Sequence, residues 1–244
     1  MVSVTSQRVV RLPRSFVRVS GPDARDYLQR MLSNDVDALA VGDTCEALLL
    51  TAKARVIAPL RVWRRGEDDF LLSTEPELGE RLRAELLRSR FAANAEIESE
   101  QHEAWRVLGG AEVVGDRPPG DEVGEEDYER WRIEAGIPRW GAEIDDRVLP
   151  AEAGLDETHV SFAKGCYPGQ EPIARQHYRG KVNRRLRVLA VEAAHPGDEV
   201  LYGDKSVGHV TSAMPGLALA YVRTEVPDEA ELLVGGAAAR LRRP

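Results

Sequence analysis

Residues 162–181, FAKGCYPGQEPIARQHYRGK, contain the side chains best suited to chemistry in this chain. Cys166 follows a lysine and a glycine, Lys164 and Gly165, and precedes a stretch of Tyr167, Pro168 and Gly169 that favours a tight, exposed turn. The thiolate is the nucleophilic form of cysteine, and a neighbouring ammonium group stabilises it. Lys164 therefore predicts a reactive thiolate at Cys166, against the ordinary alternative of a small buried hydrophobe.

The residues around this turn do not complete an enzyme. His159 and His177 could orient or deprotonate the thiol, but neither has diagnostic spacing, and surface histidines are the alternative. A self-contained iron–sulfur site needs about four cysteine or histidine ligands. We therefore expect no permanently bound metal, although Cys166 could contribute one ligand to a transient, shared cluster. A basic run follows and favours a solvated face over a binding site for an anionic tail or a partner: Arg175, Arg179, Lys181, Arg184, Arg185 and Arg187.

The composition restricts the class of protein. The 244 residues are 43% hydrophobic and 30% charged, which is typical of a globular chain. A formal net charge of −8 argues against nucleic-acid or membrane affinity of the whole chain. Cys45 and Cys166 form no CxxC motif, and we find no secretory signal or membrane-spanning run. We therefore expect a cytoplasmic protein with reduced thiols, and a monomer by default.

The elements that must position Cys166 can be read from hydrophobic spacing. Helices are expected within residues 21–36, with Ser20 as N-cap, and at about 75–90, where Thr74 and Glu77 have the spacing of a capping box. Strands are expected at 16–20, at 70–73, in AEIES and AWRVLG, and as a pair within 46–63 joined by a polar segment at 51–55.

The second half of the chain has a different texture. Residues 115–130, GDRPPGDEVGEEDYER, are rich in proline, glycine and acids and predict a loop or linker. After Lys181, short apolar segments alternate with glycine, proline and aspartate at regular intervals. This rhythm predicts a small antiparallel barrel or sandwich at the C-terminus.

The motif KGCYPGQE at 164–171, followed by ARQHYRGKVNRRL at 174–186, resembles the YgfZ family of folate-binding, iron–sulfur-related proteins. That family is related to the glycine-cleavage T-protein, an aminomethyltransferase. Segments 19–36, 131–155 and 208–223 show the same resemblance, which therefore covers nearly the whole chain. Gly165, Tyr167, Gly169, Gln170 and Glu171 match as the turn around Cys166 and Lys164, the pair to which the resemblance gives the chemistry.

The resemblance implies an α+β fold, a cloverleaf of three units with a C-terminal antiparallel β-barrel. Residues 1–180 would form the folate-binding region. Within them an N-terminal unit is completed by 125–180, and a ferredoxin-like unit is inserted at about 46–115. Residues 181–244 would form the barrel.

The resemblance also implies a pterin site. Glu134 matches a carboxylate that can accept two parallel N–H bonds from the aminopyrimidine edge of a pterin. By spacing alone it would be a surface helix acid. Trp131 and Tyr128 are candidates for the aromatic walls, with core packing as the alternative, and Arg132 is a candidate for the folate tail or a structural residue.

The chain departs from the T-protein at the catalytic position. Where the T-protein has paired aspartates, one of them catalytic, this chain has Ala58 and Pro59. Neither side chain can take a proton or stabilise a developing positive charge. Ala54 also replaces the usual glycine in the preceding turn, so the shape of that turn is an open question.

Three functions remain from the sequence. The first is a tetrahydrofolate-binding auxiliary protein that helps to assemble or repair iron–sulfur clusters in client enzymes, and so supports tRNA modification indirectly. Cys166 would act there as nucleophile, transient cluster ligand or redox group. The alternative is a folate-dependent one-carbon transferase with Asp145, Asp146 or Glu171 as acid–base group, and a third is a partner-binding relative without folate. The expected partners are folate and iron–sulfur clients, with no direct contact to nucleic acid or membrane.

Overall fold

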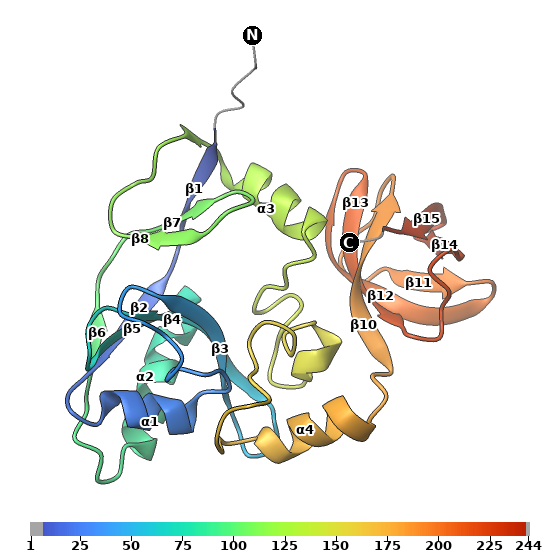
Figure 1. The fold of residues 1–244 in the computed structure, drawn as a ribbon. Coiled ribbons are helices and arrows are strands. Elements are labelled where there is room, and N and C mark those ends of the chain that lie inside the picture. Colours follow the sequence, from blue (N-terminus) through green and yellow to red (C-terminus); the bar gives the residue numbers. More distant parts are fainter. Residues whose placement is uncertain (1–6, 243–244) are drawn as a thin grey trace.

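The computed structural model describes residues 7–242 and shows three groups of elements around a common centre (Figure 1). A five-stranded sheet with two helices lies beside a four-stranded sheet and helix α3. A barrel forms the opposite lobe, and α4 runs along the near edge between the first sheet and the barrel. No helix in the described range is long and apolar enough to span a bilayer. The predicted α+β cloverleaf with a C-terminal barrel is confirmed.

The five-stranded antiparallel sheet has the order β3-β4-β5-β2-β6. Its strands are β2 (Ser15–Ser20), β3 (Thr44–Leu50), β4 (Val56–Arg64), β5 (Asp69–Thr74) and β6 (Glu96–Glu100). All five were expected from their apolar runs. Because β2 pairs with both β5 and β6, the strand pairing crosses the expected unit boundary at residue 46.

Helices α1 (Ala24–Met31) and α2 (Gly79–Ser89), the latter preceded by a 3₁₀ turn η1 (Pro76–Leu78), pack on this sheet. Their apolar faces bury Leu28, Leu82 and Leu86 in one core cluster, as the three- and four-residue spacing predicts. The expected caps are wrong. The N-cap of α1 is Asp23 rather than Ser20. The Thr74 hydroxyl donates instead to the carbonyl of Pro59, at 2.7 Å, because Thr74 ends a strand that lies beside β4.

The four-stranded sheet has the order β8-β7-β1-β9. Its strands are β1 (Arg8–Leu12), β7 (Ala104–Val107), β8 (Glu112–Val114) and β9 (Asp121–Glu122), and α3 (Glu125–Glu134) follows directly. The interpretation of 115–130 as a loop is therefore only partly right. Backbone N–H groups of Asp121 and Val123 donate to the carbonyls of Gln7 and Val9, so the open edge of β1 turns part of the expected linker into a strand.

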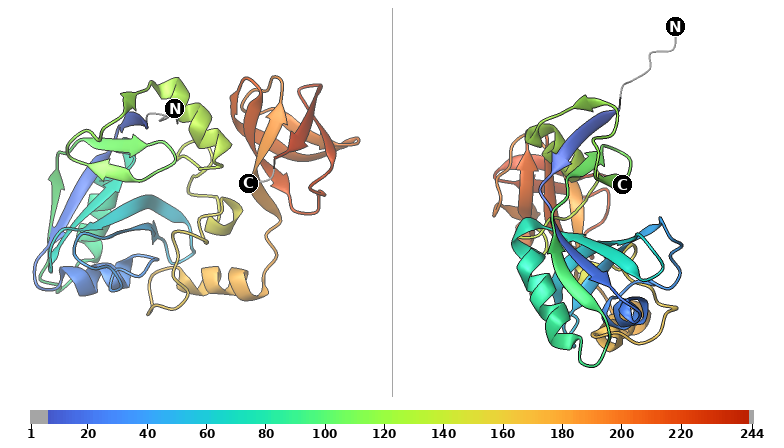
Figure 2. Two further views of the ribbon diagram at one scale, coloured as in Figure 1. Left: turned by 45° about the horizontal axis from the view of Figure 1, so that its top comes forward. Right: turned by 90° about the vertical axis from the view of Figure 1, so that its left-hand side faces the viewer.

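The C-terminal lobe is a closed barrel, not a sandwich, with the order β10-β13-β12-β11-β14-β15 (Figure 2). Its strands are β10 (Arg184–Val191), β11 (Glu199–Tyr202), β12 (Lys205–Met214), β13 (Leu217–Arg223), β14 (Glu231–Val234) and β15 (Ala237–Leu241). Alternate residues such as Val200, Leu232 and Val234 fill its interior.

Residues 135–183 connect the lobes through the 3₁₀ turn η2 (Pro150–Glu152) and helix α4 (Gln170–Arg179). A separate core cluster joins this connection to the rest of the molecule. In it Tyr167 and Ile173 pack with Leu48, Leu50 and Ala54 of the β3–β4 hairpin. The cysteine turn is therefore anchored to the first sheet.

Candidate functional site

Cys166 is exposed, on a turn whose neighbouring residues are fixed. Tyr167 is buried in the cluster beneath the hairpin, and burial raises the pKa of its hydroxyl to about 12. Gly165 is exposed, with open space where a side chain would be. A rigid anchor on one side and an open approach on the other present the sulfur to solvent, as the sequence predicted for this turn.

Gly169 closes the turn and is the N-cap of α4, with φ of +84°. A methyl group on it would lie 2.6 Å from the carbonyl oxygen of Thr51 and 3.1 Å from Cα of Ala54. The close approach and the left-handed backbone both require glycine. The tip of the β3–β4 hairpin and the start of α4 are thus in direct contact.

Ala54 keeps the hairpin turn in a left-handed conformation although it is not glycine. Its φ is +57°, its N–H donates to the Thr51 carbonyl at 2.9 Å, and its methyl group is fully buried. The open question about this turn is answered: the alanine adopts the conformation that would favour glycine, and its methyl group packs in the cluster with Tyr167.

Ser33 and Asn34, which follow α1, connect the segment before the cysteine turn to the first sheet. The Ser33 hydroxyl donates to the carbonyl of His159 at 2.6 Å and accepts the N–H of Leu48 at 2.8 Å. The side-chain amide of Asn34 donates to the carbonyls of Glu46 and Thr158. These contacts cross 12 to 126 residues of sequence, so no local pattern could have revealed them.

Lys164 has an additional, structural role. Its buried ammonium group donates to the carbonyls of Gln29, Leu32 and Asn34, near the C-terminal end of α1, where free carbonyls favour a cation. Burial lowers the pKa of Lys164 to about 8. Its effect on Cys166 stays a prediction. An unchanged alkylation-rate profile of Cys166 against pH in Lys164→Ala would contradict it.

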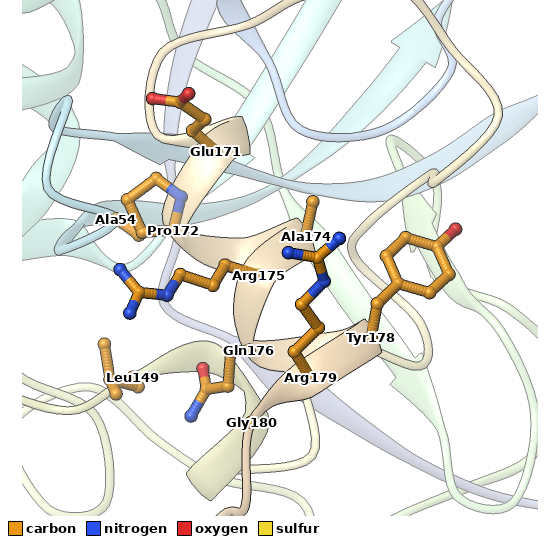
Figure 3. A pocket seen from close by; sticks show the side chains of 10 residues that line it. All are labelled: Ala54, Leu149, Glu171, Pro172, Ala174, Arg175, Gln176, Tyr178, Arg179 and Gly180. Carbon is orange, nitrogen blue, oxygen red and sulfur yellow. The ribbon is translucent and has the colours of Figure 1, made fainter.

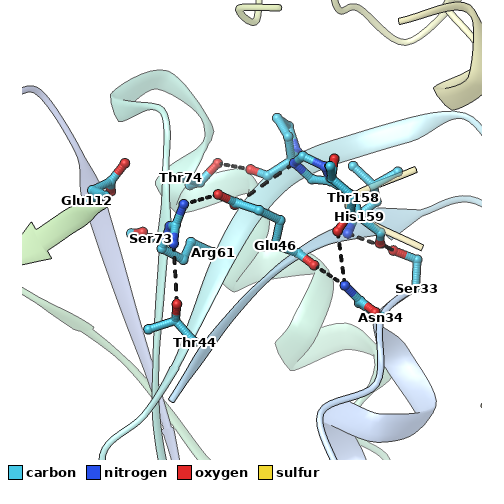
Figure 4. Close-up of polar contacts among 12 residues, drawn as sticks. Ser33, Asn34, Thr44, Glu46, Arg61, Ser73, Thr74, Glu112, Thr158 and His159 are labelled. Carbon is cyan, nitrogen blue, oxygen red and sulfur yellow. Dashed lines mark hydrogen bonds and ion pairs between the residues drawn. The ribbon is translucent and has the colours of Figure 1, made fainter. Parts of the chain in front are cut away.

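The two histidines considered as bases have other neighbours. The His177 ring stacks on Phe162 with centroids 3.9 Å apart. Nδ1 of His159 is 2.7 Å from the Thr158 hydroxyl, and its Nε2 lies 4.0 Å from the Glu46 carboxylate (Figure 4). Burial, and then the charge of Arg61, lower the pKa of His159 to about 4.

A cleft lies between the two sheets, α3 and the connecting segment. It has an inner cavity of about 110 Å³ and an outer cavity of about 570 Å³, which share Arg14, Glu75, Arg106, Ile137 and Pro138. Together they have the size of a typical small-molecule site. His159 lines the inner cavity, whereas Cys166 lines neither.

The wall of this cleft is charged and partly desolvated. The buried Glu112 carboxylate pairs with Arg14 at 3.2 Å and with Arg106 at 3.5 Å. Glu46 accepts a hydrogen bond from Arg61, and Glu75 lies 3.4 Å from Arg14. Burial raises the pKa of both Glu46 and Glu75. Among the described residues, Nε of Arg61 and Nε of Arg106 are buried without a hydrogen-bond partner.

Arg132, expected at a folate tail, lines the outer cavity but has no donor left for a ligand. Its five N–H groups are all matched: two to Glu129, one each to Glu143 and Ser212, and one to the carbonyl of Ile137. The side chain is 1% exposed. The structure therefore corrects the folate-tail hypothesis, because Arg132 joins α3 to the connecting segment and the barrel.

The other residues expected at the pterin do not lie together. Tyr128 lines the outer cavity, and the Trp131 ring lies 5.9 Å from it with Arg106 over its face, outside the cavity lining. Glu134 is exposed, lies 3.5 Å from the Arg242 guanidinium, and lines neither cavity. The acids that do line the cleft come from scattered positions, and sequence reasoning assigned none of them to the site: Glu46, Glu75, Glu77, Glu112, Glu122, Glu125 and Glu129.

Ala58 and Pro59 lie on β4 and are buried. Pro59 lines the inner cavity, whereas Ala58 packs in the core of the first sheet. Among residues 7–242, no group of three or more histidine, cysteine, aspartate and glutamate side chains is arranged to hold a metal ion.

The acid–base candidates of the alternative enzyme lie outside the cleft. Asp145 accepts the backbone N–H groups of Arg147 and Val148, which help to lower its pKa against the opposing effect of burial. Asp146 is exposed, and Glu171 is exposed in the first turn of α4. The structure brings none of the three to the charged wall.

The arrangement of these lobes is the fold of an aminomethyltransferase. The structure superimposes on the glycine cleavage system aminomethyltransferase T of Bartonella henselae with a TM-score of 0.84, covering 98% of this chain and 86% of that one. The two sequences are 18% identical, so this comparison establishes the fold alone.

Sequence comparisons identify the relatives. Residues 183–244 match the family CAF17, C-terminal beta-barrel domain. An aminomethyltransferase of Rippkaea orientalis is 31% identical (84% of this chain, 49% of its own length). The IBA57 homologue of Neurospora crassa, an iron–sulfur cluster assembly factor, is 27% identical (75% and 54%). The tRNA-modifying protein YgfZ of Pectobacterium atrosepticum is 29% identical (71% and 67%).

The predicted relationship to YgfZ and the aminomethyltransferases is confirmed, and it extends to IBA57. The chain spans about half the length of the aminomethyltransferase and IBA57 relatives that it matches.

Proposed function

We propose that this protein is a folate-binding auxiliary factor for the assembly or repair of iron–sulfur clusters in client enzymes. The observation that carries the proposal is the exposed Cys166 on a buried anchor, in a fold whose central cavity is lined by Pro59 where an aminomethyltransferase would need a carboxylate. Relatives named as an iron–sulfur assembly factor and a tRNA-modifying protein support the same role. An effect on tRNA modification would be indirect, through the clients.

The central cleft fits a reduced folate. Its volume suits a ring system with a tail, and Tyr128 and Trp140 supply aromatic surface. Glu75 lines both cavities, and its carboxylate could accept paired N–H bonds from the aminopyrimidine edge of a pterin. Arg11 and Arg139 line the outer cavity with exposed side chains that suit the carboxylates of a folate tail. Folate would supply one-carbon or redox chemistry.

The Cys166 sulfur is the group that meets a client. Its exposure suits attack by the thiolate, transient ligation of a cluster, or thiol–disulfide exchange. The fixed turn keeps the sulfur at one place on the surface. Each of the three roles requires the sulfur itself, so they share one test.

The test combines a cellular and a binding measurement. Cys166→Ala should abolish rescue of a strain that lacks the protein, read as activity of an iron–sulfur enzyme, and should leave the melting temperature unchanged because the side chain is exposed. Calorimetry should show tetrahydrofolate binding that Glu75→Gln weakens by about 1–3 kcal/mol through the lost charge-assisted bonds. Glu134→Gln is the matched comparison, because Glu134 is the residue that the family resemblance assigns to the pterin. Full rescue by Cys166→Ala would refute the proposal.

A second candidate is a folate-dependent one-carbon transferase. The raised pKa of Glu46 and Glu75 favours it, because carboxyl groups that hold a proton more readily suit acid–base catalysis. Turnover of a methylated amine by the purified protein with tetrahydrofolate and no client would establish this enzyme. Binding without turnover, together with loss of rescue in Cys166→Ala, supports the auxiliary role.

A further inference from the structure

An open groove of about 1190 Å³ runs along α4, the helix that follows the cysteine turn in the chain (Figure 3). Helix α4 contributes most of its lining, and Ala54 of the β3–β4 hairpin and Leu149 lie opposite. The surface is largely apolar, from Leu149, Pro172 and Ala174, with the exposed ring of Tyr178 at its rim. A surface of this kind on a solvent-facing helix is typical of a docking site.

Two cations in the groove have side chains without a partner among the residues that the structure describes. Arg175 and Arg179 are one helical turn apart and exposed, and within residues 7–242 neither side chain makes an ion pair or a hydrogen bond. The arginines that follow in the same basic run differ. Arg184, Arg185 and Arg187 pair with Glu152, Glu157 and Asp228, respectively. The chain carries a net charge of −8, so two free guanidinium groups on one apolar face are a local exception.

We propose that this groove docks an acidic segment of a partner protein, in which carboxylates flank an apolar side chain. The carboxylates pair with Arg175 and Arg179, and the apolar side chain covers Leu149, Pro172 and Ala174. The guanidinium groups favour carboxylates through bidentate hydrogen bonds. The inference rests on the proposed function in one respect, that the segment belongs to the iron–sulfur protein that meets Cys166.

Gly169 links the groove to the cysteine turn. Gly169, three residues after Cys166, is in contact with Ala54, which forms the opposite wall of the groove. Glu171, in the first turn of α4, lines the same groove. A segment bound there would therefore hold its protein beside the sulfur.

The lining favours protein over single-stranded nucleic acid. Phosphate tracking needs many cations, and two free guanidinium groups with one exposed ring do not make a stacking platform. Phe162 and His177 are stacked on each other and not free for bases. Aliphatic walls contribute nothing to phosphate binding but stabilise an apolar side chain.

A display library of random 12-residue peptides tests the proposal on the full chain carrying Cys166→Ala, which prevents capture through disulfides. We expect the enriched peptides to share two acidic residues around an apolar one. A synthetic peptide of that consensus should bind at least about tenfold more weakly when the chain also carries Arg175→Glu or Arg179→Glu. Its affinity for the chain with both arginines should fall with added salt. Lys205→Glu, a matched charge reversal at an exposed site on the barrel, should change the affinity less than twofold.

Enrichment without acidic residues, or equal binding to the charge-reversed variants, would overturn the proposal. So would binding of a labelled twelve-nucleotide oligouridylate that the same variants lose while no peptide is enriched. Failure of the proposed function gives a different result, namely no tetrahydrofolate binding and full rescue by Cys166→Ala. Peptide binding does not depend on either readout.

Discussion

At the scale of single residues, burial decides what a side chain can do. His159 is distant in sequence from the other groups of the cleft, yet the structure places it beside Glu46 and Arg61. Burial and the charge of Arg61 lower its pKa to about 4, so the folded protein holds it neutral at physiological pH. The neutral ring is therefore suited to accept a hydrogen bond or to coordinate a metal ion rather than to act as a cation.

This burial predicts a pH dependence of stability. The unfolded chain takes up the proton near the ordinary pKa of 6.5, whereas the folded chain does so near 4, so stability is lost as the pH falls through this window. We expect the wild type to lose about 2 kcal/mol from this group between pH 7.5 and pH 5, and His159→Gln to lack that loss. Urea unfolding at both pH values measures the difference.

The control for this measurement is His195→Gln, whose ring is 84% exposed on the barrel. Equal losses of unfolding free energy in wild type and His159→Gln would show that His159 takes up its proton at the same pH in the folded and the unfolded chain.

At the scale of elements, one close contact positions the cysteine. The start of α4 touches the tip of the β3–β4 hairpin at Gly169, and Tyr167 is buried between them. On its other side the turn is held by the Lys164 ammonium group, which donates to carbonyls at the end of α1. Its geometry therefore depends on a glycine that the sequence motif contains and on a hairpin about 110 residues earlier, at residues 51–55.

Gly169→Ala should lower the free energy of unfolding by about 2–4 kcal/mol, because the new methyl group would lie 2.6 Å from the Thr51 carbonyl oxygen and because φ is +84°. It should also change the alkylation rate of Cys166. Gly165→Ala is the matched control: its methyl group meets open space, so we expect a change below about 0.5 kcal/mol. Equal effects of the two substitutions would disprove the hairpin contact.

At the scale of the whole molecule, a buried polar network holds the lobes together. Arg132 on α3 bonds Glu143 of the connecting segment and Ser212 of the barrel, and the Ser212 hydroxyl donates to Glu143 in turn. The Tyr221 hydroxyl of the barrel donates to the Glu143 carbonyl. Helix α3, the connecting segment and the barrel therefore share one set of hydrogen bonds rather than an apolar seam alone.

Arg132→Leu should cost about 3–5 kcal/mol of unfolding free energy, since it leaves the fully buried Glu143 carboxylate without its cation. Arg130→Leu, two residues earlier, loses only an exposed hydrogen bond to the Pro215 carbonyl and should cost less than about 1 kcal/mol. Urea unfolding of both variants measures the contrast. A similar cost for both would mean that the network does not hold the lobes.

The sequence alone determined most of the local elements and the exposure of the cysteine turn. Apolar spacing placed the strands and helices of the first sheet, and the KGCYPGQE motif indicated an exposed sulfur between glycines. These features depend on neighbours within a few residues, which is why they can be read from a single chain. The substitution of Ala58 and Pro59 for acids is equally local.

Only the tertiary structure decided which residues line the same cleft and which side chains are buried with all their partners inside the protein. Arg132 and Glu134 are two positions apart, yet one is fully matched inside the molecule and the other faces solvent. Lys164 likewise donates to carbonyls about 130 residues away. Side-chain partners and burial depend on contacts between segments that are remote in sequence, and these exist only once the sheets, the helices and the barrel have packed.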